Sequence, residues 1–526
     1  MEHTSAFNIG ETIVGTKTYD YKPKMKLKQI LEESLKSKTS ISFDDITVVP
    51  DYAYFKLNEI DMSTYFSRNI KLKIPLVSAA MDTVTESALA IELAKLGGLG
   101  VIHRNMTPDK QASQVAEVKR CLNVLIENPV CIYATETIAQ IIETYGGENG
   151  ELSFHSFPVL DEGSKLIGML GEDSFKIGDP SQTAEELTIP LMISAKEGTS
   201  IEDIYQDMKI GVVRAIPLVD ENREVKGMYV FSDVRRKIEG DEICNIDNKG
   251  HLKVGAAIGV LDDAYNRLEK LAAVNVDVVV IDTAHADSAD VLETINQIKK
   301  DYNIDVVAGN ISNGKAVKRL VDAGADGIKV GQGPGSICTT RVVAGIGRAQ
   351  VTAIYDCAKM AEDYKIPICA DGGLRYPGDI TKAIAAGANS VMLGSMFAGL
   401  EETPGEIIYY QGRKWKSYRG MGSLGAMQES QSSRERYGQE NPSKLVPEGV
   451  EGIQPYKGPL NETVGQLVGG LKAGMGYAGT KTIDELRQKG DFDRVTDAAR
   501  EESHPHDIFI TKEAPNYPGK EQNEPR

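Results

Sequence analysis

The feature that most constrains the fold of this chain is a series of eight short apolar runs, each closed by small or polar residues. They occupy residues 75–78, 98–102, 256–259, 277–282, 305–309, 326–331, 367–371 and 390–394. The runs are rich in β-branched residues and do not alternate with polar ones, which is typical of strands buried on both faces of a parallel sheet. The gaps after the third to seventh runs can each hold a crossover helix, such as 316–323 or 377–386. Eight strand–helix units predict an α/β fold, a (β/α)8 TIM barrel, rather than an open sheet.

The gap between the second and third runs is far too long for one crossover, and it contains an internal repeat. The segment FPVLDEGSKLIGM at 157–169 recurs 59 positions later as IPLVDENREVKGM at 216–228. Each copy reads as strand, turn and strand, preceded by a predicted helix at 137–144 or 200–208. Two copies indicate a paired, pseudo-symmetric module rather than a solenoid. The pair resembles a tandem cystathionine-β-synthase (CBS) unit, or Bateman module, and such modules often bind adenine or guanine nucleotides.

These patterns divide the chain into four parts. We predict an N-terminal extension at 1–40, a first barrel part at 41–122, a tandem CBS domain at 123–240 and a second barrel part at 241–526. The second barrel part includes a mobile flap at about 425–460 and a C-terminal segment. The extension is polar, and we interpret it as a solvated segment with a short helix near 28–35.

The charge and cysteine content exclude several classes of function. The chain holds 76 acidic and 59 basic residues, a net charge of −17, and its sequence pI is near 5.1. Such a chain has no global basic field to hold nucleic acid or an anionic membrane. Its six cysteines lie far apart with no CxxC pair, so neither a zinc site nor a disulfide framework is indicated. With no signal-peptide pattern and no long apolar stretch, we expect a soluble protein of a reducing compartment, the cytoplasm.

Glycine-rich segments follow the last three predicted strands, on the face where a TIM barrel has its active site. The segment GQGPGSICTT at 331–340 contains Cys338, which is either a nucleophile or a small buried side chain. The DGG triplet at 371–373 and the GS pair at 394–395 occupy the usual phosphate-binding corner. The alternative interpretation of both is a tight turn.

Two later segments carry motifs with competing interpretations. GMGSLG at 420–425 matches the dinucleotide fingerprint GxGxxG. We reject that meaning because no strand is predicted before it and it lies outside any βαβ unit. The polar stretch 428–459, with RERY at 434–437, reads as a solvated mobile loop or as an active-site flap beside the barrel mouth.

Taken together, these segments resemble the IMP dehydrogenase family over nearly the whole chain beyond the extension. The most specific pieces are VSAAMDTVTE at 77–86, GPGSICTTR at 333–341, ADGG at 370–373 and YRGMGS at 418–423. Pro334, Glu448 and the tail at 502–508 look like those of bacterial members. The resemblance implies oxidation of inosine 5′-monophosphate (IMP) by NAD and water to xanthosine monophosphate (XMP) and NADH, the committed step toward guanine nucleotides.

The resemblance also implies a covalent mechanism. Cys338 matches the family nucleophile, which adds to the electron-poor C2 of the purine so that the tetrahedral carbon can expel hydride. The resulting thioimidate must be hydrolysed by water. Arg436 and Tyr437 match the pair that activates this water, and Thr340 matches a threonine that helps to position it.

Further residues are assigned by matching the family motifs one at a time. The substrate-binding set is Met81, Ser336, Asp371, Gly372, Gly373, Gly394, Ser395, Tyr418, Gly420, Met421, Gly422 and Glu448. The set that resembles the NAD side is Asp282, Asn310, Gly331 and Gly333. A potassium (K+) site would use carbonyls of Gly333, Gly335 and Cys338, together with Glu502, Ser503 and His504 from a neighbouring subunit. The resemblance therefore implies a homotetramer or octamer, with a purine nucleotide effector at the CBS pair.

Two alternatives remain beside this interpretation. A GMP reductase shares the barrel and the cysteine but runs a deamination with NADPH, and it usually lacks both the insert and the Arg–Tyr flap. A catalytically idle nucleotide sensor would use the barrel only as a scaffold. The joint presence of Cys338, Thr340, Arg436 and Tyr437 counts against the sensor.

Overall fold

The computed structural model describes residues 28–517, except 122–124, 127–128, 146–155, 172–173, 176–177, 191–192, 197, 240–242, 440, 442–443 and 513. The predictions made for residues 1–27 lie outside the described residues. Within the described ranges, no helix is long and apolar enough to cross a membrane.

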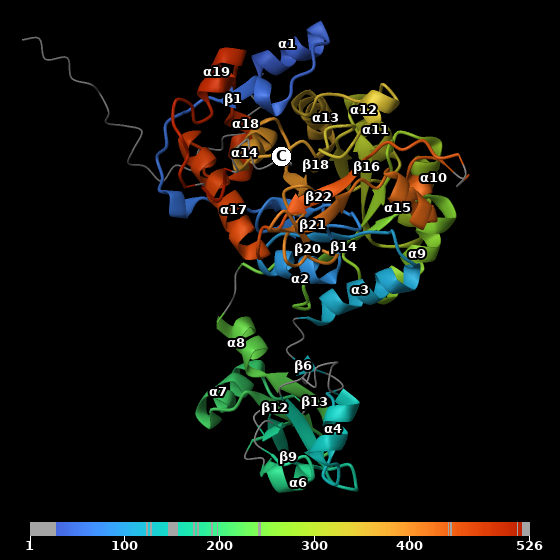
Figure 1. Ribbon diagram of the computed structural model, residues 1–526, viewed down its shortest axis with the longest axis vertical. Helices are drawn as coiled ribbons and strands as arrows, with labels where there is room; N and C mark the ends of the chain where they lie inside the picture. Colours follow the sequence, from blue (N-terminus) through green and yellow to red (C-terminus); the bar gives the residue numbers. More distant parts are fainter. Residues whose placement is uncertain are drawn as a thin grey trace, which may run out of the picture.

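Eight parallel strands form the central sheet, as the apolar runs predict (Figure 1). They are β4 (Leu76–Ser78), β5 (Gly100–Ile102), β14 (Val254–Ile258), β15 (Val278–Asp282), β16 (Asp305–Ile311), β17 (Gly327–Val330), β18 (Ile368–Asp371) and β19 (Ser390–Leu393). Their order is β4-β19-β18-β17-β16-β15-β14-β5, and a parallel bridge between Val77 and Leu99 joins the two ends. The sheet is therefore closed into a barrel, and the TIM-barrel prediction is confirmed.

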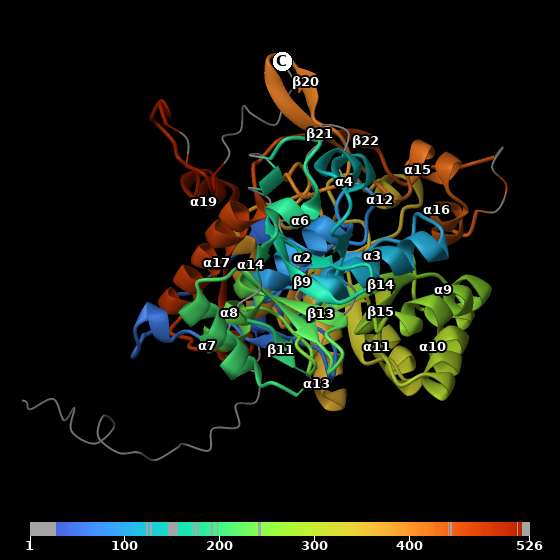
Figure 2. The ribbon, with the colours of Figure 1, turned by 90° about the horizontal axis from the view of Figure 1, so that it is seen from below.

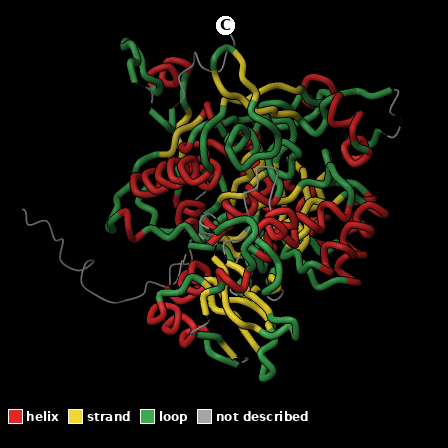
Figure 3. Tube along the Cα trace, turned by 60° about the horizontal axis from the view of Figure 1, so that its bottom comes forward, coloured by secondary structure: helices red, strands yellow, loops and turns green. Residues whose placement is uncertain are grey.

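Helices pack around the outside of this barrel, where Figure 3 shows them as an outer layer around the strands. They are α2 (Ser87–Lys95), α3 (Pro108–Arg120), α9 (Leu261–Ala273), α10 (Ala289–Asp301), α11 (Gly314–Asp322), α13 (Gln350–Tyr364), α14 (Pro377–Ala385) and α17 (Leu460–Tyr477). The sequence marks their starts: the Asn313 side chain accepts a hydrogen bond at the start of α11, and Pro377 opens α14. Both crossover helices predicted at 316–323 and 377–386 are present.

The helix predicted near 28–35 is present as α1 (Gln29–Ser37), but its inner face is not solvated. Leu31 and Lys28 are buried, and the Tyr355 hydroxyl of α13 donates a hydrogen bond to Glu32 at 2.8 Å. Leu31 belongs to the main core cluster of the barrel. This part of the N-terminal segment is therefore fixed to the barrel by packing, which polar composition alone does not predict.

The insert contains two four-stranded sheets of matching design, seen as a separate part below the barrel in Figure 1. One has the order β10-β9-β8-β7 and the other β11-β12-β13-β6. Their elements are β6 (Leu125–Ile126), β7 (Ile132–Tyr133), α4 (Ile138–Tyr145), β8 (Ser156–Leu160), β9 (Leu166–Gly171), α6 (Ala184–Leu187), β10 (Ile189–Pro190), β11 (Ala195–Lys196), α7 (Ile201–Gly211), β12 (Ala215–Val219), β13 (Val225–Val230) and α8 (Phe231–Glu239).

The sequence repeat becomes a structural repeat in these sheets. The hairpins β8–β9 and β12–β13 carry their register shifts at equivalent places, Val159/Leu160 and Leu218/Val219. The repeated aspartates explain the turns: Asp161 accepts hydrogen bonds from two turn amides at 2.8 Å, and Asp220 does so at 2.9 Å. This paired arrangement is that of the predicted tandem CBS module.

The remaining elements frame the barrel mouth and its far end. They are β1 (Ile46–Val48), β2 (Thr64–Tyr65), β3 (Lys71–Leu72), α12 (Thr340–Val343), β20 (Ile408–Tyr410), β21 (Arg413–Arg419), α15 (Leu424–Glu429), α16 (Gln431–Arg436), β22 (Glu451–Pro455), α18 (Ile483–Lys489), β23 (Phe492–Arg494) and α19 (Asp497–Glu502). Strands β20, β21 and β22 form an antiparallel sheet, from which the β20–β21 hairpin projects in Figure 2.

Two sequence interpretations need correction here. The stretch 428–459 is not an unstructured loop, because it holds part of α15, the whole of α16 and β22. A strand, β21, does precede the GMGSLG segment, so that reason for rejecting the dinucleotide motif is wrong. The rejection itself stands, since β21 pairs only with antiparallel strands and belongs to no βαβ unit.

Candidate active site

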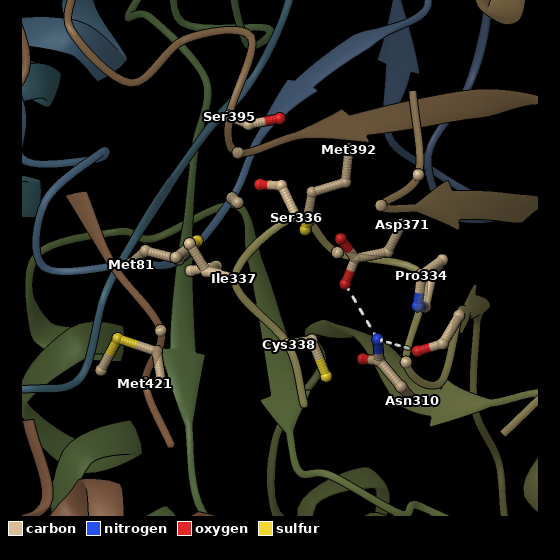
Figure 4. Close-up of a pocket in the computed structure, with 18 of the residues that line it drawn as sticks. Met81, Asn310, Pro334, Ser336, Ile337, Cys338, Asp371, Met392, Ser395 and Met421 are labelled. Carbon is tan, nitrogen blue, oxygen red and sulfur yellow. Dashed lines mark hydrogen bonds between the residues drawn. The ribbon is translucent and has the colours of Figure 1, made fainter. Parts of the chain in front are cut away.

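A cavity that is open to solvent lies at the carboxyl ends of the barrel strands. In Figure 4, Ser336 and Ser395 lie at one end of it and Cys338 lies at the other, beside Asn310. The predicted residues that line it are Met81, Asp282, Asn310, Gly331, Gly333, Gly335, Ser336, Cys338, Thr340, Asp371, Gly372, Gly373, Gly394, Ser395, Tyr418, Gly420, Met421, Arg436, Tyr437 and Glu448. One cavity thus gathers residues that span more than two-thirds of the sequence.

The loop that carries Cys338 requires glycine at its start. Gly333 has a φ of +83°, and a Cβ there would lie 2.4 Å from the Arg341 side chain. The end of the loop is pinned to the segment before β22, because Thr339 donates to the Glu448 carbonyl and Val450 donates to the Ile337 carbonyl, both at 3.0 Å. The Cys338 thiol lies 3.2 Å from the Thr340 hydroxyl. The cysteine is therefore held in the cavity rather than packed into the core.

The other end of the cavity has the character of an anion site. Gly394 lies so close to Tyr418 that a Cβ would be 3.1 Å from the phenol oxygen. Burial raises the pKa of Tyr418 to about 12, so its hydroxyl stays protonated and able to donate. Within the described part of the chain, the amides of Ser395 and Met396 have no hydrogen-bond acceptor. Free amides and a neutral phenol suit a phosphate group.

A buried lysine, which the sequence reasoning missed, organises the wall between these two ends. Lys329 on β17 is 2% exposed, and its ammonium donates to Asp371 at 2.8 Å, to Asp282 at 3.1 Å and to the Asn310 side-chain oxygen. Asn310 in turn donates to Asp371 at 2.9 Å and to the Gly331 carbonyl at 2.6 Å. The positive charge offsets two carboxylates, so Lys329 fixes the three polar groups predicted to hold ribose and cofactor.

Arg436 reaches the cavity from the end of α16 and forms an ion pair with Asp282. Its Nε atom is buried and has no hydrogen-bond partner among the residues described. Burial raises the pKa of the adjacent Tyr437, against the opposing effect of the Arg436 charge, so the phenol is neutral. A free guanidinium nitrogen beside a neutral phenol can hold a water molecule.

The helix α16 is docked on the barrel by its two serines. Arg267 of α9 donates to the Ser432 hydroxyl at 3.0 Å, and the Ser433 hydroxyl donates to the Asn105 side-chain oxygen at 3.0 Å. Arg267 is itself fixed by Asp263 at 2.8 Å. These contacts place Arg436 at the cavity.

Four predicted residues do not line the cavity. Gly422 lies behind it and leaves room for Tyr437, whose ring a Cβ at this position would meet at 2.5 Å. Glu502, Ser503 and His504 lie elsewhere in the same chain, where the His504 ring accepts or donates a hydrogen bond with Tyr517 at 2.8 Å. The two halves of the predicted potassium site are therefore not brought together within one chain.

Other cavity residues were missed because they are apolar or sit at unremarkable positions. They are Ala79, Ala80, Ala284, Gln332, Pro334, Ile337, Leu374, Met392, Leu393 and Met396. Several of them lie one or two residues after the end of a predicted strand, so their position at a strand end could have identified them as cavity residues.

The fold and the site define a TIM-barrel protein, interrupted by a tandem CBS module, with a cysteine loop and a corner suited to an anion in one cavity. Comparison with known proteins identifies the family. The family model for the IMP dehydrogenase / GMP reductase domain matches residues 40–506. The chain therefore belongs to the IMP dehydrogenase / GMP reductase family.

Similar proteins of both activities are known. The chain is 47% identical over 493 residues to the inosine-5′-monophosphate dehydrogenase of Aquifex aeolicus (strain VF5), covering 93% of this chain and 99% of that protein. It is 45% identical over 492 residues to the Bacillus subtilis (strain 168) inosine-5′-monophosphate dehydrogenase, covering 92% and 99%. A solved structure of a cysteine-to-alanine variant of Trypanosoma brucei GMP reductase, in complex with guanosine 5′-monophosphate, has a TM-score of 0.83 and 38% identity, covering 91% of this chain and all of that one.

The reductase match bears on one sequence argument. The uncovered tenth of this chain is shorter than the predicted insert at 123–240, so that reductase shares part of it. The insert alone therefore does not separate the two activities, and the distinction rests on the cavity residues.

Proposed function

We propose that this protein oxidises IMP to XMP with NAD and water, through a covalent adduct on Cys338. The observation that carries the proposal is that Cys338 and the Arg436–Tyr437 pair line one cavity, opposite a phosphate corner. The relatives named as IMP dehydrogenases, at 45–47% identity over nearly the full chain, support it. The catalytic, substrate and cofactor residues named from the sequence are part of this proposal.

The geometry supports a sequence of steps for the protein groups. The phosphate binds at Ser336, Gly373 and Ser395, which aims the purine toward Cys338 at the other end of the cavity. The Cys338 thiolate adds to C2, and Thr340 at 3.2 Å is placed to hold the incoming water. NAD, when bound, supplies the hydride acceptor. Arg436 and Tyr437 then hold the water that adds to the thioimidate carbon. The C2–S bond breaks, the departing Cys338 sulfur takes up a proton from that water, and XMP is released.

Asp282 imposes an order on these steps. It is proposed to contact the nicotinamide riboside of NAD, yet it pairs with Arg436 in this structure. Lys329 contacts one oxygen of Asp282 and Arg436 the other, so a bound riboside would compete with Arg436 for this carboxylate. We therefore propose that α16 and its neighbours at about 425–460 act as a flap that docks after the reduced cofactor leaves.

GMP reduction is the second candidate, favoured by the similarity to the Trypanosoma brucei structure. The lower identity of 38% and the Arg436–Tyr437 pair in the cavity weigh against it. One assay separates the two. With IMP and NAD we expect NADH at a rate on the order of 1 s⁻¹ or more. With GMP and NADPH we expect neither cofactor oxidation nor ammonia, and the opposite pattern would assign the reductase.

We further propose a homotetramer or octamer with a K+ site shared between neighbouring subunits. In the described part of the chain, the carbonyls of Gly333 and Cys338 accept no hydrogen bond, which leaves them free to bind a cation. Glu502, Ser503 and His504 of a neighbour would supply the remaining ligands. The ion would hold the Cys338 loop rigid without taking part in bond changes.

Replacing potassium by sodium at equal ionic strength should lower turnover by about tenfold, because a loosened loop misplaces the nucleophile. The check is the initial NADH rate in matched chloride buffers. Glu502→Ala should show the low rate in both salts. Equal rates for the unchanged protein in the two salts would contradict the potassium site.

The proposal also covers the domain boundaries and the cellular compartment of the protein. We assign 41–122 and 241–526 to the catalytic barrel and 123–240 to a CBS pair that binds a purine nucleotide effector. None of the six cysteines, all of which lie in the described ranges, forms a disulfide bond, which fits a reducing compartment such as the cytoplasm.

A further inference from the structure

Lys457 lies directly behind the phosphate corner, near the end of the 425–460 segment, and the proposed mechanism gives this residue no role. It follows β22, and its backbone amide donates to the Gly399 carbonyl at 2.9 Å. Its ammonium donates to the Ser395 carbonyl at 2.8 Å and to the Met396 carbonyl at 3.2 Å. Ser395 and Met396 both line the cavity.

The charge of this lysine is not compensated. Among the residues that the structure describes, no carboxylate forms an ion pair with Lys457, and its only polar contacts are backbone carbonyls. Lys457 is half-buried, and this burial lowers the pKa of its ammonium to about 8. A desolvated positive charge of this kind is stabilised by an anion bound nearby.

The backbone between Lys457 and the cavity can carry the effect of this positive charge to a bound anion. The segment 394–398 forms a tight turn, because Phe397 and Ala398 both donate to the Gly394 carbonyl, at 3.1 Å and 2.8 Å. The N–H and C=O of one trans peptide point in opposite directions. With the Ser395 carbonyl directed at Lys457, the Met396 amide of the same peptide points away from the lysine, and Met396 lines the cavity. This amide has no acceptor within the described ranges.

We propose that Lys457 is a positioning residue for the 5′-phosphate of the substrate. It fixes and polarises the peptide between Ser395 and Met396 and adds an uncompensated positive charge behind it. This inference rests on the proposed function only in placing a purine 5′-monophosphate at this corner. It does not depend on which reaction follows.

A second lysine whose ammonium is held by backbone carbonyls provides a matched control. Lys416 of β21 is 4% exposed and donates to the carbonyls of Leu400, Glu401 and Thr403, at 3.1, 3.0 and 2.6 Å. It holds the same stretch of chain by the same kind of contact, but none of these residues lines the cavity. Loss of Lys416 therefore reports the structural cost of removing such a lysine.

The test is equilibrium binding of IMP and of inosine, which lacks the phosphate, to the full-length protein. Lys457→Met should weaken IMP binding about tenfold, or about 1.4 kcal/mol, and change inosine binding by less than about twofold. At saturating IMP, its turnover should stay within about threefold of the unchanged protein while KM rises. Lys416→Met should leave the ratio of IMP to inosine affinity unchanged.

The outcomes are decisive in either direction. A selective loss of IMP affinity in Lys457→Met supports the proposal, even if the protein proves to oxidise no IMP. Equal weakening of IMP and inosine, or no change in either, overturns it. Should Lys457→Met fail to fold, Lys457→Gln with the same ligand pair gives the same discrimination, and Lys457→Arg should restore most of the IMP affinity.

Discussion

Cys338→Ala is expected to form no NADH, even in a single turnover with enzyme in excess. Without the sulfur no covalent bond can form at C2 of the purine, so no tetrahedral carbon exists to expel hydride. Removing a nucleophile that acts with a supporting constellation costs on the order of a million-fold in rate. The measurement is NADH absorbance after rapid mixing with IMP and NAD.

Two controls accompany this experiment: IMP binding by the variant itself, and replacement of a second cysteine. The variant should still bind IMP, because the phosphate corner lies at the opposite end of the cavity from residue 338. Cys131→Ala is the matched change, since Cys131 is a free, partly buried thiol in the insert. That variant should keep full activity. NADH formation by Cys338→Ala at more than a trace would show that the cysteine is a packing residue.

The barrel was predictable because each of its strands is one unbroken apolar run that is buried on both faces. Each run marks a strand without any long-range information. The run at 305–309, for example, corresponds to β16 (Asp305–Ile311). The site residues that lie in glycine-rich loops after these strands were predictable for the same reason, since the barrel places all such loops at one mouth.

The polar network of the wall was not predictable, because it depends on tertiary contacts. Lys329 stands inside an apolar run, and its partners Asp282 and Asp371 lie 47 and 42 positions away. Only closure of the barrel brings these groups together. A lysine inside a strand buried on both faces was nevertheless a usable signal, since such a charge must find partners.

The helix and strands in and beside the stretch 428–459 were not predicted, for a different reason. Helix α16 has six residues and is rich in serine, glutamine and arginine, so it has no apolar periodicity to detect. Its docking depends on Arg267 and Asn105, far away in the sequence. In β21 the buried positions are Lys416 and Tyr418. Because one of these inward positions holds a lysine, the sequence does not show the apolar–polar alternation expected of a strand.

Arg436→Ala is expected to fail at a different step from Cys338→Ala. Arg436 touches neither Cys338 nor the phosphate corner through any contact that the structure describes, and its buried Nε atom has no hydrogen-bond partner among the described residues. The variant should still attack IMP and reduce NAD once, giving a burst near one NADH per active site. Turnover should then fall by about a hundredfold or more, because the adduct on Cys338 waits for hydrolysis.

Two measurements check the stall. Acid quench after the burst should trap the purine on the protein, and intact mass should place one adduct per chain, on Cys338 after digestion. Arg434→Ala is the matched control, since Arg434 lies on the same helix but donates to the Met427 carbonyl at 2.6 Å and does not line the cavity. It should show no burst and little accumulated adduct.

The burst separates the three interpretations of the site, which is why this variant is the most informative one. A reductase has no hydrolytic step to stall, and an idle scaffold gives no first NADH. Loss of the first NADH in Arg436→Ala would instead mean that the Arg436–Asp282 pair supports hydride transfer, for example by shaping the cofactor side. Normal turnover would mean that water is activated elsewhere, with Thr340 as the nearest hydroxyl to Cys338.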